Sequence, residues 1–251
     1  MERKAEMNIY HITYGPAVKE VYLHFWGCNF SCRACLCKKE IHDCHLEETK
    51  DAIYDVNRRS ELPERFLDLD QVVEKLENID IAHAIFMGAE PTLDPQLPAL
   101  AEEIHRKFQA INTLLTNGYT IPPLDHIDEV VLSIKAYADE VHRQYTGRSN
   151  RRVLGNFIKL HQTPITLRSE SIYIPEYIEK KEIAKIANFI SKIDPNIPYR
   201  IDAYHPVHGN PWRPPTEQEL IEAVETAGKY LNNVTYLKSR QKILYQVHRI
   251  F

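Results

Sequence analysis

The chain alternates short apolar runs with longer segments in which apolar residues recur at helical spacing. A short apolar run bounded by turn residues is typical of a strand. The pattern predicts strands at residues 21–26, 81–87, 111–115, 130–134, 165–174 and 199–204.

The segments between these runs have the periodicity of amphipathic helices. The apolar residues of segment 69–76 recur three and four positions apart, so they would share one helical face. Thr216 begins the last helix, and Glu219 three residues later completes the pattern of a capping box. The sequence therefore predicts helices at residues 69–76, 95–108, 150–160 and 181–193, and after Thr216.

Strands that alternate with helices predict right-handed βαβ units and a parallel sheet. Six such strands favour an α/β fold of the TIM type, as a partial, open six-stranded (βα)6 barrel rather than a closed eight-stranded one. We expect a single domain over residues 1–251, with an N-terminal extension (1–20), a barrel core (21–216) and a C-terminal helix and tail (217–251). Residues 38–68 are dense in charge, and we expect a helix there followed by a surface excursion.

Composition narrows the class of protein. The chain has 251 residues, a hydrophobic fraction of 43 % and a charged fraction of 26 %, which are ordinary for a globular domain. Its formal net charge of −4 gives no electrostatic footprint for nucleic acid. No apolar run reaches the roughly 20 residues that span a bilayer, and the charged first residues lack a secretory signal. We expect a cytoplasmic protein that binds neither nucleic acid nor a membrane.

Three cysteines follow the first predicted strand directly. Cys28, Cys32 and Cys35 are spaced four and three residues apart, in a loop that must curl to bring their sulfurs together. Three thiolates can bind three irons of a cubane iron–sulfur cluster, whereas full ligation by cysteine takes four. One iron would then stay open to a ligand that is not cysteine.

Two other interpretations of these cysteines stay open. They could be thiols without a function, or they could bind zinc with a fourth ligand from Cys37, His42, Cys44 or His45. Cys37 and Cys44 alone are too few to ligate an additional cluster. We interpret both as free thiols, and Cys37 is the residue that would close the open iron if it were a ligand.

The spacing Cys-x3-Cys-x2-Cys on the loop after the first strand resembles the signature of the radical SAM superfamily. The resemblance implies a 4Fe–4S cluster whose open iron chelates S-adenosylmethionine. Reduction by a donor such as flavodoxin or ferredoxin would release a 5′-deoxyadenosyl radical, which abstracts a hydrogen atom from the substrate. Ala34 stands where the family usually has an aromatic residue near the adenine.

Unusual residues lie at the ends of the predicted strands, where parallel βα barrels carry their chemistry. Gly88-Ala89-Glu90-Pro91 resembles the Gly-Gly-Glu-Pro segment of the same family, which implies contact with the methionine end of the cofactor. Thr116-Asn117-Gly118 resembles a turn at the end of the family's third strand. The alternative interpretations are a plain strand-to-helix turn and a common Asn-Gly turn.

Two further candidates are similar to residues of the pyruvate formate-lyase activating enzyme. Lys135 ends the fourth strand, where activating enzymes have Asp-x-Lys, and His205 resembles a histidine that contacts the cofactor after the sixth strand. The resemblance implies that both face the carboxylate or nucleoside of the cofactor. An exposed lysine and a structural histidine are the alternatives.

The choice of branch rests on two more segments. Residues 139–147 are similar to an acidic-x-x-His segment of activating enzymes, and Ile174-Pro175-Glu176 is similar to their Val-Pro-Gly. This implies an enzyme that abstracts hydrogen from a protein or peptide, as a glycyl-radical-enzyme activase does. One alternative is a radical SAM enzyme acting on a small metabolite or another peptide side chain. Another is a non-catalytic binding module stabilised by zinc or a cluster.

Overall fold

The computed structural model describes residues 6–38, 46, 62–239 and 244–251. They form an α/β fold around one nine-stranded sheet with the order β8-β7-β6-β5-β4-β3-β2-β1-β9. Strands β2 to β8 run parallel, whereas β1 pairs antiparallel with both β2 and β9. The strands are β1 (Ile9–Gly15), β2 (Glu20–Phe25), β3 (His83–Gly88), β4 (Ile111–Thr116), β5 (Glu129–Ser133), β6 (Thr166–Tyr173), β7 (Tyr199–Ala203), β8 (Val234–Leu237) and β9 (His248–Arg249).

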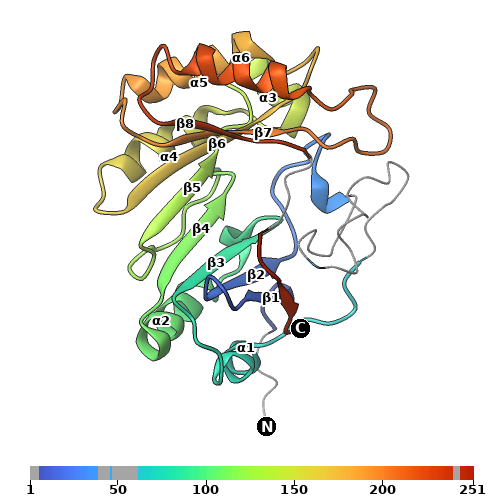
Figure 1. Ribbon diagram of the computed structural model, residues 1–251. Helices are drawn as coiled ribbons and strands as arrows, with labels where there is room; N and C mark the ends of the chain where they lie inside the picture. The colour runs from blue at the N-terminus through green and yellow to red at the C-terminus, as the bar shows by residue number, and fades with distance from the viewer. Residues whose placement is uncertain (1–5, 39–45, 47–61, 240–243) are drawn as a thin grey trace.

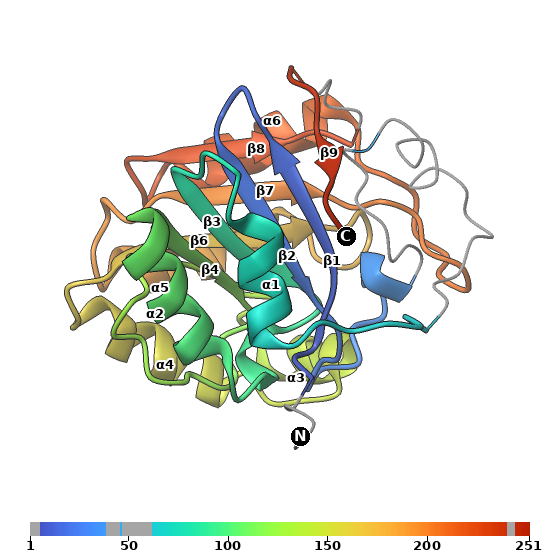
Figure 2. The same cartoon turned by 90° about the horizontal axis from the view of Figure 1, so that it is seen from below.

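Helices cover one face of this sheet (Figure 1). Figure 2 shows α1 and α2 beside the first strands, and α4 and α5 further along. Thr216 and Glu219 form the predicted capping box of α6, and Asp68 forms another with Gln71 at α1. The helices are η1 (Leu36–Lys38), α1 (Leu69–Leu76), η3 (Pro91–Leu93), α2 (Leu97–Phe108), α3 (Asp139–Thr146), α4 (Arg151–His161), α5 (Lys180–Ser191) and α6 (Glu217–Ala227).

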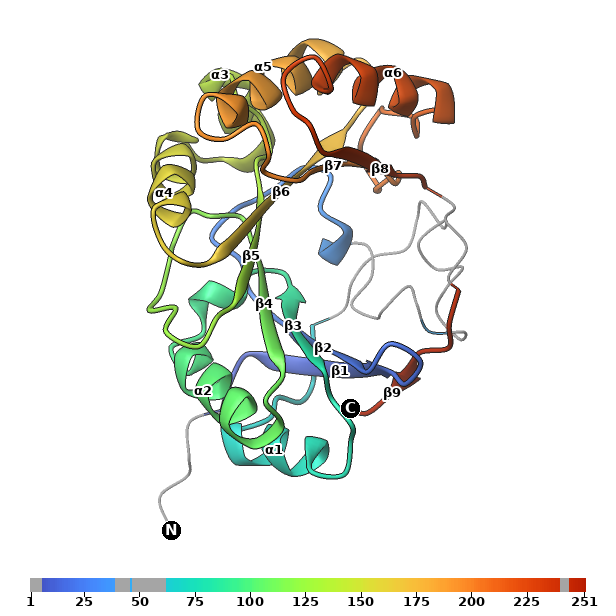
Figure 3. The same cartoon turned by 60° about the vertical axis from the view of Figure 1, so that its left-hand side comes forward.

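The sheet is strongly curved, with its helices outside and η1 on its inner side (Figure 3). Strand alternation sorts the side chains between these faces. On β7, Tyr199 and Ile201 are buried among the core residues, whereas the alternate residues Arg200 and Asp202 carry charge on the other face. The inner face of the sheet therefore carries polar groups that are not part of the hydrophobic core.

All six predicted strands are present, and their ends differ from the prediction by at most a few residues. The sheet has nine strands, because it also contains β1, β8 and β9, and the six-stranded partial barrel stays a prediction. β1 lies in the expected N-terminal extension, and β8 and β9 lie in the expected tail. Most of segment 38–68, for which a helix was expected, falls outside the described residues. None of the described helices has the length and apolar character that crossing a membrane requires.

Candidate functional site

The cysteine loop, residues 28–35, is held by the C-terminal end of α3. The Ser31 N–H donates to the Thr146 carbonyl at 2.8 Å, and the Arg33 N–H donates to the Tyr145 carbonyl at 3.0 Å. The last carbonyls of a helix have no partner within the helix itself. The helix end and the loop therefore satisfy each other's backbone groups.

His142 of α3 also packs against the cysteine loop. Its ring is fully buried and packs edge-on against Phe30, with the ring centroids 5.4 Å apart. Its Nδ1–H donates to the Arg148 carbonyl at 2.7 Å, since a carbonyl can only accept. Burial lowers the pKa of His142, so the ring stays neutral in this position.

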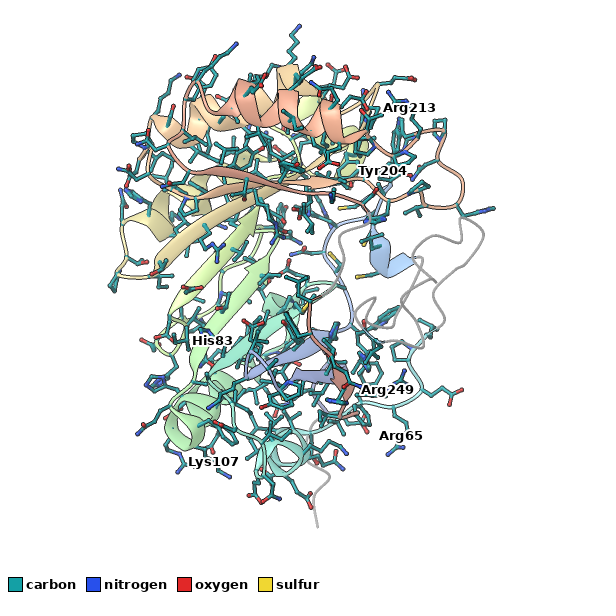
Figure 4. The ribbon with its side chains drawn as sticks, in the orientation of Figure 1. Arg65, His83, Lys107, Tyr204, Arg213 and Arg249 are labelled. Carbon is teal, nitrogen blue, oxygen red and sulfur yellow. The ribbon has the colours of Figure 1, made fainter. Side chains whose placement is uncertain are left out.

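Arg33 provides a second anchor for the loop. Its guanidinium lies 4.6 Å from the ring centroid of Trp212 and 5.7 Å from that of Tyr177, and these two rings stack. Asn210 Nδ2 donates to the Arg33 carbonyl at 2.8 Å. Trp212 also packs edge-on against Tyr204, which is labelled in Figure 4. The segments that follow β6 and β7 thus fix the loop together.

Sulfur atoms gather on the inner side of the sheet near η1 (Figure 4). The Cys37 thiol hydrogen-bonds with Cys35, and Cys28 lies near enough to Cys35 for their charges to interact. Cys28 Sγ accepts hydrogen bonds from the Phe30 N–H at 3.4 Å and from Asn117 Nδ2 at 3.6 Å. Burial raises the pKa of the Cys28 thiol, and these two donors act against that rise.

The cysteines have the chemistry that a 4Fe–4S cluster requires. Cys28, Cys32, Cys35 and Cys37 form no disulfide bond among the described residues. Across the described residues, no three His, Cys, Asp or Glu side chains converge as the ligands of one metal ion would. Cluster ligands each bind a different iron, and hydrogen bonds to sulfur such as those at Cys28 tune these centres. The candidate zinc ligands His42, Cys44 and His45 lie outside the described residues.

Glu90 joins the carboxyl ends of β3 and β4. Its side chain is buried and accepts hydrogen bonds from the Thr116 hydroxyl at 2.7 Å and the Thr92 hydroxyl at 2.5 Å. Its second oxygen accepts from the Asn117 N–H at 2.8 Å. Burial raises the pKa of Glu90, and these donors oppose the rise. Both carboxylate oxygens therefore have partners within the protein.

Gly88 lets β3 approach β2 closely at the site. Its φ is +103°, and a Cβ there would lie 2.6 Å from the Phe25 carbonyl oxygen, so only glycine fits. The Ala89 N–H donates to that same carbonyl at 2.9 Å. The backbone of 88–89 is thus fixed beside the strand that leads into the cysteine loop.

Asn117 connects the end of β4 to the cysteine loop. Its Nδ2 donates to Asn29 Oδ1 at 2.8 Å as well as to Cys28 Sγ, and its Oδ1 accepts from the Tyr119 N–H at 2.9 Å. The Thr116 hydroxyl, which donates to Glu90, also accepts a hydrogen bond from the Gly118 N–H at 3.0 Å. The predicted residues at the ends of β3 and β4 and the cysteine loop thus form one hydrogen-bonded unit.

Lys135 lies directly beyond β5 and faces the cysteines. Burial by itself would lower its pKa, but the charges of Cys32, Glu170, Cys35 and Asp202 together raise it. The lysine therefore stays protonated beside the sulfur atoms. His205, the other residue predicted on the resemblance to activating enzymes, is half-buried and follows β7 in the segment that reaches the loop through Asn210.

A charged group on the inner face was not predicted from the sequence. Arg200 donates to both oxygens of Asp202, at 2.6 and 3.0 Å, and to Glu170 at 2.8 Å. Glu170 also accepts from the Ser133 hydroxyl. The available signal was the alternation of charged and apolar residues in 199–203, together with the charged residues two positions apart at 168 and 170. These patterns placed the charges on one face of each strand.

The titration of Asp202 should be visible in the stability of the protein. Burial raises the pKa of Asp202 to about 6, with Glu170 adding to the shift and Arg200 opposing it. A raised carboxyl pKa stabilises the fold below the unfolded value of 3.8, and this contribution is lost as the pH rises through about 6. We expect the free energy of unfolding of wild type, relative to Asp202→Asn, to fall between about pH 4 and about pH 8. Urea denaturation of both proteins at the two pH values measures this free energy. If the difference between wild type and Asp202→Asn did not change with pH, the raised pKa of Asp202 would be contradicted.

The fold and the site define an α/β enzyme with its reactive groups at the carboxyl ends of parallel strands. Residues 22–190 match the Radical SAM superfamily, and the chain belongs to that superfamily. Its members use a 4Fe–4S cluster and S-adenosylmethionine, the cofactors that the resemblance to this superfamily implied. The resemblance drawn from Cys28, Cys32 and Cys35 is thereby confirmed at the level of the family.

One relative covers most of the chain. It is a protein of Methanocaldococcus jannaschii, named as a proposed glycyl-radical enzyme activating enzyme. The two are 30 % identical over 238 residues, which are 91 % of this chain and 84 % of the relative. The predicted similarity to activating enzymes is therefore confirmed by a comparison that extends well beyond the cysteine loop.

Solved structures share the fold at lower identity. Streptococcus suis SuiB bound to S-adenosylmethionine is 14 % identical with a TM-score of 0.60, covering 85 % of this chain, which spans 48 % of SuiB. Escherichia coli QueE is 12 % identical with a TM-score of 0.58, covering 93 % of this chain and 94 % of QueE. A domain of the pyruvate formate-lyase-activating enzyme from Bacteroides vulgatus is 16 % identical with a TM-score of 0.52, covering 62 % of this chain and 99 % of the domain. These likenesses concern the fold.

Proposed function

We propose that this protein is a radical SAM activase that takes a hydrogen atom from a backbone glycine of a partner enzyme. The observation that carries the proposal is the similarity, over 91 % of this chain, to the Methanocaldococcus jannaschii protein named as a proposed activating enzyme. The segment 139–147, which resembles activating enzymes, adds support. The Tyr145 and Thr146 carbonyls of this segment accept backbone hydrogen bonds from the cysteine loop.

In this proposal Cys28, Cys32 and Cys35 are the metal ligands and the catalytic centre. The cluster and S-adenosylmethionine, when bound, supply the 5′-deoxyadenosyl radical that abstracts hydrogen. The α3 carbonyls and the Arg33 anchor hold the loop in one curled conformation. Pre-organisation of this kind places a reactive group within reach of its substrate.

The strand-end residues would bind the cofactor. Gly88 and Ala89 offer a fixed backbone to the methionine end, while Glu90 and Thr116 brace the two strands. Asn117 links this brace to Cys28. The proposed cofactor-binding set is Gly88, Ala89, Glu90, Thr116, Asn117, Lys135 and His205.

Lys135 would contribute charge to this set. It is half-buried near Cys32 and Cys35, and the surrounding negative charges raise its pKa. A protonated lysine can attract a carboxylate, such as that of the cofactor's methionine. His205 would act nearby from the segment after β7.

The proposal also covers the architecture of the enzyme, its cellular location and its electron donor. The curved sheet is consistent with a partial barrel in which β2 to β7 form the core, within a single domain of residues 1–251. We expect a cytoplasmic location, because a reducing compartment keeps cysteine ligands available to a cluster. An acidic redox protein such as flavodoxin or ferredoxin would deliver the electron.

The source of the abstracted hydrogen tests the function. The reconstituted enzyme would be incubated anaerobically with S-adenosylmethionine, dithionite and a dialysed protein extract of the source cells grown on α-deuterated glycine. We expect deuterium in the 5′-deoxyadenosine, detected by mass spectrometry, because the radical takes one atom from the glycine α-carbon. The matched control is the same extract from cells grown on unlabelled glycine.

Other outcomes would decide between the remaining activities. Deuterium-free 5′-deoxyadenosine, with turnover stimulated only by the small-molecule fraction of the extract, would replace the activase with an enzyme that acts on a metabolite. Stimulation by the protein fraction without deuterium transfer would indicate another peptide side chain.

A further inference from the structure

Three exposed arginines lie together where α3 ends and α4 begins: Arg148, Arg151 and Arg152. We call them the arginine patch. None of the three forms an ion pair with a carboxylate among the residues described here, whereas the nearby Arg143 is paired with Asp139 at 2.8 Å. The protein as a whole carries a net charge of −4, so this patch is a local exception.

The arginine patch borders the cysteine loop. Arg148 Nε donates to the Asn29 carbonyl at 3.4 Å, and Asn29 directly follows Cys28. Both Arg148 and Arg152 lie over the ring of Tyr119, at 6.0 and 5.1 Å from its centroid. The patch therefore lies on the outer surface immediately beside a residue that the cluster requires.

Two aromatic rings lead from the patch toward the sulfur atoms. Tyr119 packs edge-on against Phe30, with the ring centroids 5.5 Å apart. The Phe30 N–H in turn donates to Cys28 Sγ at 3.4 Å. A partner bound on the arginine patch would therefore lie against side chains that contact the cysteine loop directly or through Tyr119.

We propose that the arginine patch is the docking surface for an acidic protein that carries one electron at a time, such as a reduced flavodoxin. Arginines that are not neutralised by the carboxylates of the described chain favour a carboxylate-rich partner and accelerate its encounter. In the complex the carrier loses one electron and the cluster-loaded enzyme gains it, and no bond forms or breaks in that step. This inference rests on the reductive chemistry of the family and does not depend on the identity of the substrate.

The basic residues near the C-terminus are a weaker candidate for this role. Lys238 is already paired with Glu217 at 3.4 Å. Arg240 and Lys242 lie outside the described residues. Arg249 lies at the pocket lined by Tyr10, His11 and Phe251, away from the cysteine loop in Figure 4.

Charge reversal tests the docking surface. Wild type, the triple variant Arg148→Glu/Arg151→Glu/Arg152→Glu and the matched control Lys181→Glu/Lys192→Glu/Lys229→Glu would be titrated with a bacterial flavodoxin by calorimetry. The control reverses three exposed lysines on and after α5 and α6. We expect the patch variant to weaken binding about tenfold or more and the control to leave it within about twofold. Raising the salt from about 50 mM to about 300 mM should weaken wild-type binding in the same direction.

A second readout separates this inference from the proposed function. The double variant Arg151→Glu/Arg152→Glu should produce 5′-deoxyadenosine at the wild-type rate with dithionite, because a small reductant needs no docking surface, and at a reduced rate with flavodoxin. The double variant Arg151→Glu/Arg152→Glu guards against misfolding, because neither side chain supports the loop by a hydrogen bond to a described residue. Wild-type flavodoxin affinity in the patch variant, or no flavodoxin binding by wild type, would overturn the inference.

Discussion

Replacing Cys32 by alanine is expected to abolish iron binding and, with it, formation of 5′-deoxyadenosine. Cys32 is buried in the cysteine loop, so no external thiol or water can take the place of its sulfur. Two thiolates would remain for a centre that needs three protein ligands. Iron content and the visible absorption of the reconstituted protein measure cluster assembly, and chromatography of the nucleoside measures the reaction.

Cys37→Ala is the matched control for this experiment. Cys37 hydrogen-bonds with Cys35 and lies near Cys28, but the three-cysteine signature does not require it. We expect the variant to keep its iron and to produce 5′-deoxyadenosine at close to the wild-type rate. Loss of iron in Cys37→Ala would show that Cys37 completes the ligation and leaves no open iron. Zinc in place of iron in the wild type would contradict the cluster itself.

The parallel core of the fold was predictable because most of its strands contain short, mainly apolar runs, as in β2, where five of six residues are buried. Short, mainly apolar runs such as 130–134 then stand out from the amphipathic helices around them. The added strands lack that signal. β8 alternates half-buried and exposed residues, and β9 has two residues, both exposed. β1 is defined by its antiparallel pairing with β2 and β9, which only the folded structure supplies.

The site was predictable to the extent that it lies at strand ends. Parallel strands end at one edge of a sheet, so the sequence alone was enough to group Cys28, Asn117 and Lys135. What holds the cysteine loop could not be predicted. The carbonyls of α3 have no sequence signal, and Trp212 is far from Arg33 in the chain although it lies against its guanidinium.

Glu90→Gln is expected to destabilise the fold by about 2 kcal/mol, and Glu90→Ala by about 3 kcal/mol or more. In wild type, one carboxylate oxygen accepts from Thr92 and Thr116 and the other accepts from the Asn117 N–H. Glutamine keeps only one acceptor oxygen, so its NH2 group must face one of these donors. Alanine leaves all of them buried without an acceptor, which costs more than a poorly oriented hydrogen bond. Urea denaturation monitored by circular dichroism gives both values.

The matched control is Glu129→Gln, also on the sheet, where the carboxylate is half-buried and accepts one hydrogen bond from Thr113 at 3.3 Å. We expect it to cost less than about 1 kcal/mol, because solvent can satisfy the groups left without a partner. The difference between the variants isolates the position of Glu90, since the chemical change is the same. If Glu90→Gln kept wild-type stability but lost affinity for S-adenosylmethionine, the carboxylate would act on the cofactor directly. Equal loss of stability and affinity would identify Glu90 as the brace that sets the ends of β3 and β4.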